Sequence, residues 1–253
     1  MHYYIYDQFL SDKKFEPAIN RIEARLTDLG INGKTEKLTI LKSFSEAVRN
    51  VSKKEITTIV AVGNDNTISK IISLLPNLNV TLGIIPIGPE NEIAKMLGIP
   101  DNEAACDVLS ARIIEKIDLG KANNYYFISH LQLPSTKELI LDCGGYKISP
   151  LQDDNQINIC NFNLSTSNTH KCNPKDGLLE AIIAPVAKST NFFSSFSKKY
   201  SKSSVFPLKK MRVKCNTESL QAMADGHTTI KTPIAVEVIP KKLKIIVGKN
   251  RMF

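Results

Sequence analysis

The chain has 253 residues, of which 42% are hydrophobic and 23% charged, and this is the composition of a globular protein with one large domain or two small ones. Its apolar runs are shorter than the roughly 20 residues that a membrane-spanning helix needs. The N-terminal residues lack the pattern of a signal peptide, and the five cysteines form no C-x-x-C pair. We therefore expect a cytoplasmic protein with reduced thiols.

Strand and helix patterns alternate in the first part of the chain. β-Branched apolar runs at 56–62 and 80–86 are typical of buried parallel strands, and the apolar residues of 15–29 recur at helical spacing. In chain order we expect a strand at 2–6, a helix at 15–29, a strand at 37–41, a helix at 43–51, a strand at 56–62, a helix at 68–75, a strand at 80–86 and a helix at 91–97. This succession predicts an α/β domain with a parallel sheet.

The pattern changes after Ile117-Asp118-Leu119-Gly120. Short β-rich runs, separated by turns, are expected at 125–129, 138–141, 156–161, 179–183, 211–215, 234–239 and 243–247. A helix is expected at 190–200. The predicted layout is an α/β domain at 1–118 and a mainly antiparallel, β-rich domain at 119–253. We leave open whether the last strand, at 243–248, returns to the first domain.

Two polar turns follow the buried strands of the first part. One is Gly63-Asn64-Asp65-Asn66-Thr67, and the other is Gly88-Pro89-Glu90-Asn91-Glu92. Glycine lets a phosphate approach the backbone closely, and a following helix N-terminus offers free N–H donors. Thr67 suits a helix N-cap or a hydroxyl contact to phosphate. The alternative is that the residues from Asn64 to Thr67 only form a turn and a cap.

Taken together, the turns resemble two motifs of the diacylglycerol kinase catalytic-domain family, which includes bacterial lipid kinases and sphingosine kinases and is related to NAD kinases. That family has Gly-Gly-Asp-Gly-Thr after one strand, and Pro-Leu-Gly-Thr-Gly-Asn-Asp before a helix that often ends in Leu-Gly-Ile-Pro. The chain has Leu97-Gly98-Ile99-Pro100 at the matching distance. Asp176-Gly177-Leu178-Leu179-Glu180 and Asp225-Gly226-His227 resemble the later segments Asp-Gly-Leu-Leu-Asp and Asp-Gly-Glu.

The resemblance implies phosphoryl transfer from ATP to a lipid hydroxyl with Mg²⁺. It makes 1–118 the nucleotide-binding domain and 119–253 the substrate domain. The nucleotide-binding residues would be those of the two turns: Gly63, Asn64, Asp65, Asn66, Thr67, Gly88, Glu90 and Asn91. Asp225 would be the catalytic carboxylate near the acceptor hydroxyl. Asp176 would hold a structural Mg²⁺, with the carbonyl groups of Leu178 and Asn173 nearby.

Several positions depart from the family pattern. Asn64 and Asn66 replace glycines, and we expect the turn to persist because asparagine tolerates left-handed backbone angles. Pro89 removes an N–H donor, and Glu90 places a negative charge near the phosphates. His227 replaces an acidic residue. Two functions stay open: a divergent ATP-dependent lipid kinase, or a catalytically impaired member that serves as a nucleotide, lipid or protein binding module.

A basic segment accounts for the uneven charge. Residues 181–217 contain no acidic residue and carry eight cations, a number equal to the net charge of +8: Lys188, Lys198, Lys199, Lys202, Lys209, Lys210, Arg212 and Lys214. Two interpretations stay open: a solvated helix that packs its aromatic residues on the β-rich domain, or peripheral contact with the inner face of an anionic membrane. No nucleic-acid reading motif accompanies it, so a lipid acceptor is the expected partner beside ATP, and a homodimer is left open.

Overall fold

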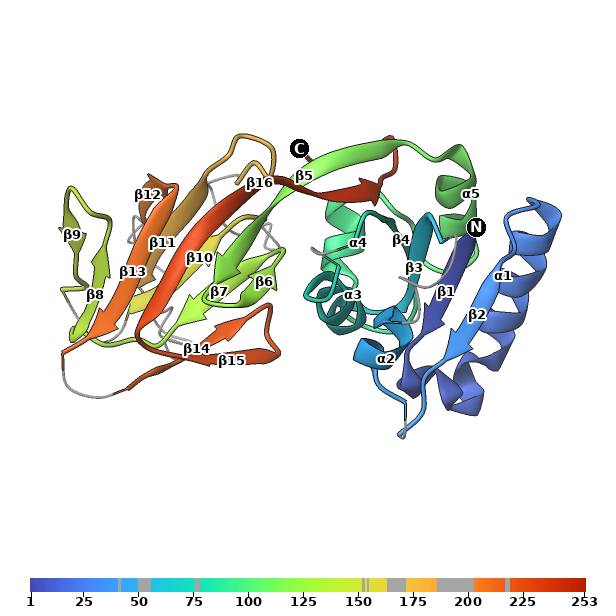
Figure 1. Ribbon diagram of the computed structural model, residues 1–253, viewed down its shortest axis with the longest axis horizontal. Helices are drawn as coiled ribbons and strands as arrows, with labels where there is room; N and C mark the ends of the chain where they lie inside the picture. The colour runs from blue at the N-terminus through green and yellow to red at the C-terminus, as the bar shows by residue number, and fades with distance from the viewer. Residues whose placement is uncertain are drawn as a thin grey trace, which may run out of the picture. The chain divides into compact units, whose positions relative to one another are not determined.

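The computed structural model describes residues 1–40, 42–49, 56–75, 78–151, 153, 155–162, 172–185, 203–216 and 219–253. The chain divides into two compact units (Figure 1). The first unit contains Met1–Leu119 and Pro240–Phe253, and the second contains Gly120–Ile239. The expected helix at 190–200 lies outside the described residues, as do Lys188, Lys198, Lys199 and Lys202. None of the helices in the described ranges has the length and apolar character needed to cross a membrane.

A parallel sheet forms the centre of the first unit. Its strands are β1 (His2–Tyr6), β2 (Lys34–Lys37), β3 (Thr58–Gly63) and β4 (Thr81–Pro86), in the order β2-β1-β3-β4. Every residue of β3 and β4 is buried, because helices cover both faces of the sheet. The parallel α/β architecture is confirmed. The expected strand at 37–41 is wrong in position, since the edge strand β2 is a polar, mostly exposed Lys-Thr-Glu-Lys segment without a hydrophobic pattern.

Helices lie on both sides of this sheet. The helices α1 (Glu16–Asp28) and α5 (Ala104–Ala111) lie on one side, and α2 (Phe44–Arg49), α3 (Asp65–Ile72) and α4 (Glu92–Met96) lie on the other (Figure 1). Two short 3-10 helices, Gln8–Ser11 and Lys13–Phe15, connect β1 to α1. The helix α1 buries Ile19, Ile22 and Leu26, as its spacing predicts. Four of these helices match expected ones with shifted ends, whereas α5 was not predicted.

Two antiparallel sheets enclose the core of the second unit. One contains β13 (Lys210–Cys215), β8 (Leu139–Asp142), β9 (Lys147–Ile148) and the first part of β16 (Ile234–Ile246), with β5 (Ile114–Ala122) and β6 (Tyr125–Phe127) attached. The other has the order β12 (Ser204–Leu208), β11 (Leu179–Pro185), β10 (Asn155–Cys160), β7 (His130–Leu133), β14 (Gln221–Ala224) and β15 (Thr228–Lys231). Side chains from both sheets form one hydrophobic cluster, so the β-rich expectation is confirmed.

One long strand replaces two expected ones. The sequence predicted separate strands at 234–239 and 243–247, because Pro240-Lys241-Lys242 has the character of a turn. The structure instead shows β16 continuous over Ile234–Ile246, with Lys241 in the left-handed region at φ 52°. The Lys241 N–H donates to the buried Asp118 carboxylate at 2.7 Å. That bond satisfies a backbone donor at an irregular point of the strand, and the end of β16 then pairs in parallel with β4.

Candidate functional site

The two turns lie next to each other at the carboxyl ends of neighbouring parallel strands. Gly63, the last residue of β3, is in register with Pro86, the last residue of β4, and Ile87 N–H donates to the Gly63 carbonyl at 3.0 Å. The helix α3 begins two residues after Gly63, and α4 begins four residues after Gly88. This is the edge of an open α/β sheet at which ligands usually bind.

Asn64, not Thr67, caps the first helix. Its side chain accepts from Thr67 N–H at 3.3 Å, while Thr67 Oγ1 accepts from Asn64 N–H at 3.2 Å, so the pair forms a capping box. The N-cap role expected for Thr67 is therefore wrong, because Thr67 is the third residue of the box. The Thr67 hydroxyl donates to Asp7 Oδ2 at 2.5 Å and is fully buried, which leaves it no proton for a phosphate.

The turn persists without the left-handed asparagines that we expected. Asn64 has an extended backbone, with φ −103° and ψ −172°, and Asn66 lies in the first turn of α3. Positive φ angles occur at Gly63 (φ 155°) in the first turn and at Gly88 (φ 91°) and Glu90 (φ 64°) in the second. A Cβ atom at Gly63 would lie 2.8 Å from Thr67 Cβ and still closer to Thr67 Oγ1, so glycine is required there by close approach as well as by φ.

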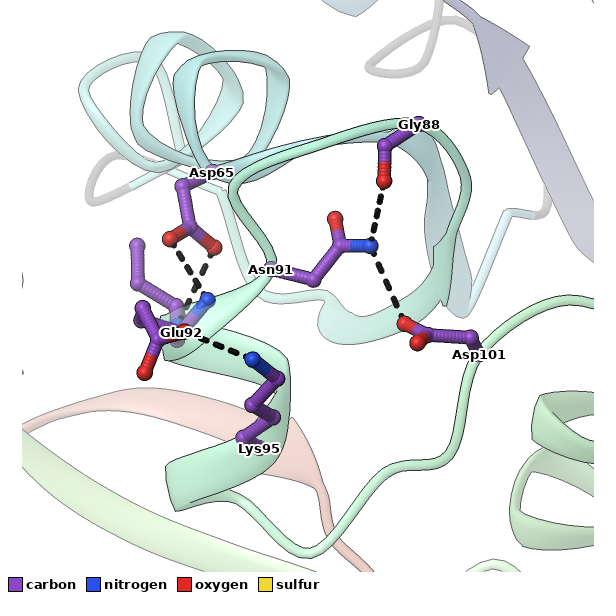
Figure 2. A network of polar contacts seen from close by, with 7 residues as sticks. Asp65, Gly88, Asn91, Glu92, Lys95 and Asp101 are labelled. Carbon is purple, nitrogen blue, oxygen red and sulfur yellow. Dashed lines mark hydrogen bonds and ion pairs between the residues drawn. The ribbon is translucent and has the colours of Figure 1, made fainter.

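Asp65 joins the two turns. Its N–H donates to the Glu90 carbonyl at 2.9 Å, and its carboxylate accepts from the N–H groups of Glu92 at 2.8 Å and Ile93 at 3.1 Å (Figure 2). The N-cap residue of α4, Asn91, makes no side-chain cap bond. The carboxylate of Asp65 therefore caps α4 from the neighbouring turn and fixes the spacing of the two turns.

Burial raises the pKa of the Asp65 carboxyl group above its ordinary value. Desolvation raises its pKa to about 7, the two N–H donors oppose this, and the Glu92 and Glu90 carboxylates add to the increase. A raised carboxyl pKa means that the folded state binds the proton more tightly than the unfolded chain. The resulting stability is fully present below about pH 4 and is lost as the pH rises towards 7.

We predict that wild type gains stability relative to Asp65→Asn as the pH falls from 7 to 4. The expected gain is about 1–2 kcal/mol after allowance for partial solvent exposure. The difference between urea denaturation curves of the two proteins measures it, since other carboxyl groups cancel in that difference. A pH-independent difference would contradict the raised pKa.

Asn91 supplies a buried acceptor without a partner. Its Nδ2 donates to the Gly88 carbonyl at 2.9 Å and to Asp101 Oδ1 at 3.0 Å (Figure 2). Two acceptors on one side fix the amide orientation. The Oδ1 atom is buried and, among the described residues, has no hydrogen-bond partner. A buried oxygen in this state is stabilised by a hydrogen-bond donor or a cation, so the nucleotide-binding role of Asn91 stays a prediction.

The three residues proposed for a structural cation lie in one exposed loop before β11. Asp176 Oδ1 accepts from Leu178 N–H at 2.9 Å, and Asp176 N–H donates to the Asn173 carbonyl at 3.4 Å. Within the described ranges, no group of three or more His, Cys, Asp or Glu side chains has metal-binding geometry. A cation at this loop would therefore have the Asp176 carboxylate together with carbonyl, amide and water oxygens, and this role stays a prediction.

Asp225 lies in the turn between β14 and β15, at φ 47°. Its carboxylate accepts from the N–H groups of Ile128 at 2.9 Å, Ser129 at 2.8 Å and His130 at 3.2 Å, and from Ser129 Oγ at 2.5 Å. The His227 ring contacts the Asp225 carbonyl through Nδ1 at 3.1 Å. These bonds hold the start of β7 in place, and the catalytic role of Asp225 stays a prediction.

Ser129 and His130 were missed in the sequence. They precede Asp225 by 96 and 95 residues and belong to no motif, so only the fold brings the three together. Both lie in the second unit, as do Asp176 and Asp225, whereas all the nucleotide-binding candidates lie in the first unit.

Residues 3–122 match the diacylglycerol kinase catalytic domain family. The match covers a little under half of the chain, so it shows similarity to that family in this part of the sequence. A diacylglycerol kinase of Bacillus subtilis is 29% identical over 129 residues, which are 49% of this chain and 43% of that protein. A Staphylococcus haemolyticus relative is 22% identical over 248 residues, 80% of each chain. The chain thus matches less than half the length of the Bacillus subtilis protein.

The fold extends the likeness to the whole chain. A crystal structure of a diacylglycerol kinase from Bacillus anthracis superposes with a TM-score of 0.78 and covers 99% of this chain and 98% of that one. The identity is 16%, so this comparison establishes the fold alone. The two-part architecture predicted from the resemblance is therefore that of a diacylglycerol kinase fold.

Proposed function

We propose that this chain is a divergent lipid kinase that transfers the γ-phosphoryl group of ATP to a hydroxyl of a diacylglycerol-like lipid. The observation that carries the proposal is the pair of adjoining turns, held together by Asp65, with the buried Oδ1 of Asn91 lacking a partner among the described residues. Phosphoryl transfer depends mainly on positioning and charge neutralisation. Rigid turns with an oriented acceptor oxygen meet the first requirement.

The candidate site residues would have different roles in phosphoryl transfer. Gly63 and Gly88 allow the phosphates close to the backbone, and Asn91 orients the nucleotide through its free amide oxygen. Mg²⁺, bound together with ATP, would supply the charge neutralisation that the exposed Glu90 opposes. Asp225 and the groups around it would receive the acceptor hydroxyl. Asn173, Asp176 and Leu178 would fix their loop around a second cation.

One observation favours the alternative of a catalytically impaired binding module. The carboxylate of Asp65 and the hydroxyl of Thr67, two polar groups expected to contact the nucleotide, are both used in internal hydrogen bonds. Pro89 and Glu90 add the loss of a donor and a negative charge. A module of this kind would bind nucleotide or lipid without turnover.

Calorimetric titration with Mg-ATP, followed by an assay of phosphoryl transfer to diacylglycerol in mixed micelles, tests the proposal. We expect weak binding and measurable transfer by the wild type, with loss of transfer in Asp225→Asn at a temperature where that variant stays folded. Binding without transfer would favour the module, and no binding at millimolar nucleotide would exclude both the kinase and a nucleotide module.

Removing the Glu90 charge should strengthen nucleotide binding. A carboxylate about 4 Å from a phosphate costs about 1 kcal/mol at an exposed position, so Glu90→Gln should lower the Kd for Mg-ATP about fivefold. Glu23→Gln is the matched control, because Glu23 is a carboxylate on α1 whose one ion pair among the described residues is with Lys37. Equal affinities in the two variants would show that Glu90 does not face the phosphates.

The proposed setting is the cytoplasmic face of an anionic membrane. The described part of the basic segment places Lys210, Arg212 and Lys214 at exposed or half-exposed positions along β13. Cations in this arrangement attract acidic head groups. Sedimentation with vesicles of anionic and of neutral lipid would test this contact, and light scattering would test for a homodimer.

A further inference from the structure

A cavity of about 540 Å³ lies on the outer face of the sheet that contains β13 and β16. Strands β5, β8, β13 and β16 line it, together with the turns that follow β5 and β8. All of its lining residues belong to the second unit. The candidate residues for phosphoryl transfer are not among them, so the proposed reaction does not account for this cavity.

The alternation of side chains along the strands places cations around the cavity. Met211 of β13 points into the core, so its neighbours Lys210 and Arg212 point to the outer face. Ala235 of β16 lies directly opposite Arg212, and its small side chain leaves room beside the guanidinium group. At the other end of the lining, a Cβ atom at Gly144 would meet no heavy atom within 4 Å. The cavity is therefore open on both sides of Arg212.

Asn123 fixes one wall of the cavity. Its N–H donates to the Ala235 carbonyl at 2.8 Å, and its Oδ1 accepts from the Ala235 N–H at 2.9 Å. These reciprocal bonds hold the turn after β5 against β16. A wall that is fixed before a ligand arrives lowers the entropy cost of binding.

The two carboxylates in the lining have cationic partners. Glu237 lies between two ammonium groups, 3.4 Å from Lys121 Nζ and 3.4 Å from Lys210 Nζ. Asp142 lies 4.0 Å from Lys214 Nζ, with Lys214 on the same face of β13. The negative charges of the cavity are thus balanced before Arg212 is counted.

Arg212 adds a cation without a partner. Asp142 lies directly opposite it in the pairing of β13 with β8, a position at which opposite charges often interact. Nevertheless, within the ranges that the structure describes, no hydrogen bond or ion pair joins the Arg212 guanidinium group to another residue. Four cations therefore surround two carboxylates, which leaves a local excess of two positive charges.

We propose that this cavity binds a phosphate monoester, with Arg212 donating two hydrogen bonds to the phosphate oxygens. The planar fork of a guanidinium group matches two oxygens of one phosphate. A phosphate monoester has a charge of about −2 near neutral pH, which matches the local excess, whereas a carboxylate or a phosphodiester has one negative charge. The volume is in the range of pockets that hold an organic ligand, so the organic part of the ester also has room.

The inference goes beyond the proposed function and needs no catalysis. We expect glycerol 3-phosphate, the first probe, to bind the full-length wild type in an NMR titration, with a shift of the Arg212 Nε–H signal. Arg212→Gln should weaken this binding at least about tenfold. Lys231→Gln is the matched control, because Lys231 is an exposed cation of the other sheet in the same unit. Equal weakening in both variants would reduce the effect to general charge attraction and overturn the proposal.

Sedimentation with vesicles distinguishes a lipid from a soluble ester. Phosphatidic acid carries a phosphate monoester and phosphatidylglycerol a phosphodiester, and the two lipids are compared in phosphatidylcholine vesicles of equal surface charge. A preference for phosphatidic acid that is lost in Arg212→Gln would assign the cavity to a lipid head group. Binding of glycerol 3-phosphate without that preference would assign it to a soluble ester. Absence of both, or equal affinity of glycerate and glycerol 3-phosphate, would overturn the monoester site.

Cys143 provides a measurement on the wild type alone. Its side chain is half-buried in the lining of the cavity, whereas Cys215, at the end of β13, does not line it. At about four times its Kd, glycerol 3-phosphate should slow alkylation of Cys143 about fivefold and leave Cys215 unaffected. Tryptic peptides 138–147 and 215–231 report the two thiols separately. An unchanged rate at Cys143 with the ester bound would place the ester outside this cavity and overturn the assignment.

Discussion

Replacing Asp225 by alanine is expected to destabilise the second unit by about 3–5 kcal/mol. The change removes the acceptor for three consecutive backbone N–H groups and one hydroxyl, and donors left unpaired near the core are costly. It also places alanine at φ 47°, where residues other than Gly, Asn and Asp are strained. Loss of the carboxylate should therefore free the start of β7.

The variant Asp225→Asn distinguishes the cost of the lost hydrogen bonds from the cost of backbone strain at φ 47°. Asp225→Asn keeps a residue that tolerates left-handed angles and one acceptor oxygen, so a smaller loss of about 1–2 kcal/mol is expected. Hydrogen exchange of the Ile128, Ser129 and His130 amides measures the stability of the start of β7 directly. It reports on the second unit independently of the first.

Asp142→Ala is the matched control for both variants, because the Asp142 carboxylate accepts one exposed backbone bond, from Gly144 N–H at 3.1 Å, and has only a distant ion pair, 4.0 Å from Lys214. Unchanged protection of the three amides in Asp225→Ala would show that the carboxylate has no structural role.

These contacts mark the limit of what the sequence predicts. The strands β3 and β4 and the helix α1 follow from local patterns, because burial on two faces or on one helical face leaves a periodic signal. The edge strand β2 leaves no such signal. Strands β7, β14 and β15 are only four residues each, too short for alternation to be distinguished from chance.

The position of the two turns was predictable, but the partners of their polar side chains were not. Gly63 and Gly88 mark the turns, and the structure places them side by side. The use of each polar side chain depends on partners far away in the chain. Thr67 bonds to Asp7, 60 residues earlier, and Asp65 caps a helix 27 residues later. Local motifs do not contain such pairings, so the structural partners of these two motif residues could not be predicted from the sequence.

Asp65→Ala should couple a loss of stability to a loss of nucleotide binding. Without the carboxylate, the Glu92 and Ile93 N–H groups at the start of α4 lose their acceptor, and we expect a cost of about 1–3 kcal/mol at pH 6. At that pH the side chain is largely protonated, since its pKa is about 7, so relief of a buried charge contributes little. The two turns then lose their fixed spacing, and Mg-ATP affinity should fall at least about tenfold.

Asp65→Asn distinguishes a structural link from a direct ligand. Its amide oxygen still accepts one of the two bonds, so a structural Asp65 predicts that asparagine retains most of the stability and most of the affinity. A carboxylate that itself holds the cation of Mg-ATP predicts the opposite pattern, with affinity lost and stability kept. Paired urea denaturation and calorimetric titration of the two variants measure both quantities. Because alanine removes both bonds and asparagine only one, a parallel decline of stability and affinity across the series would identify Asp65 as the residue that positions the two turns for the phosphates.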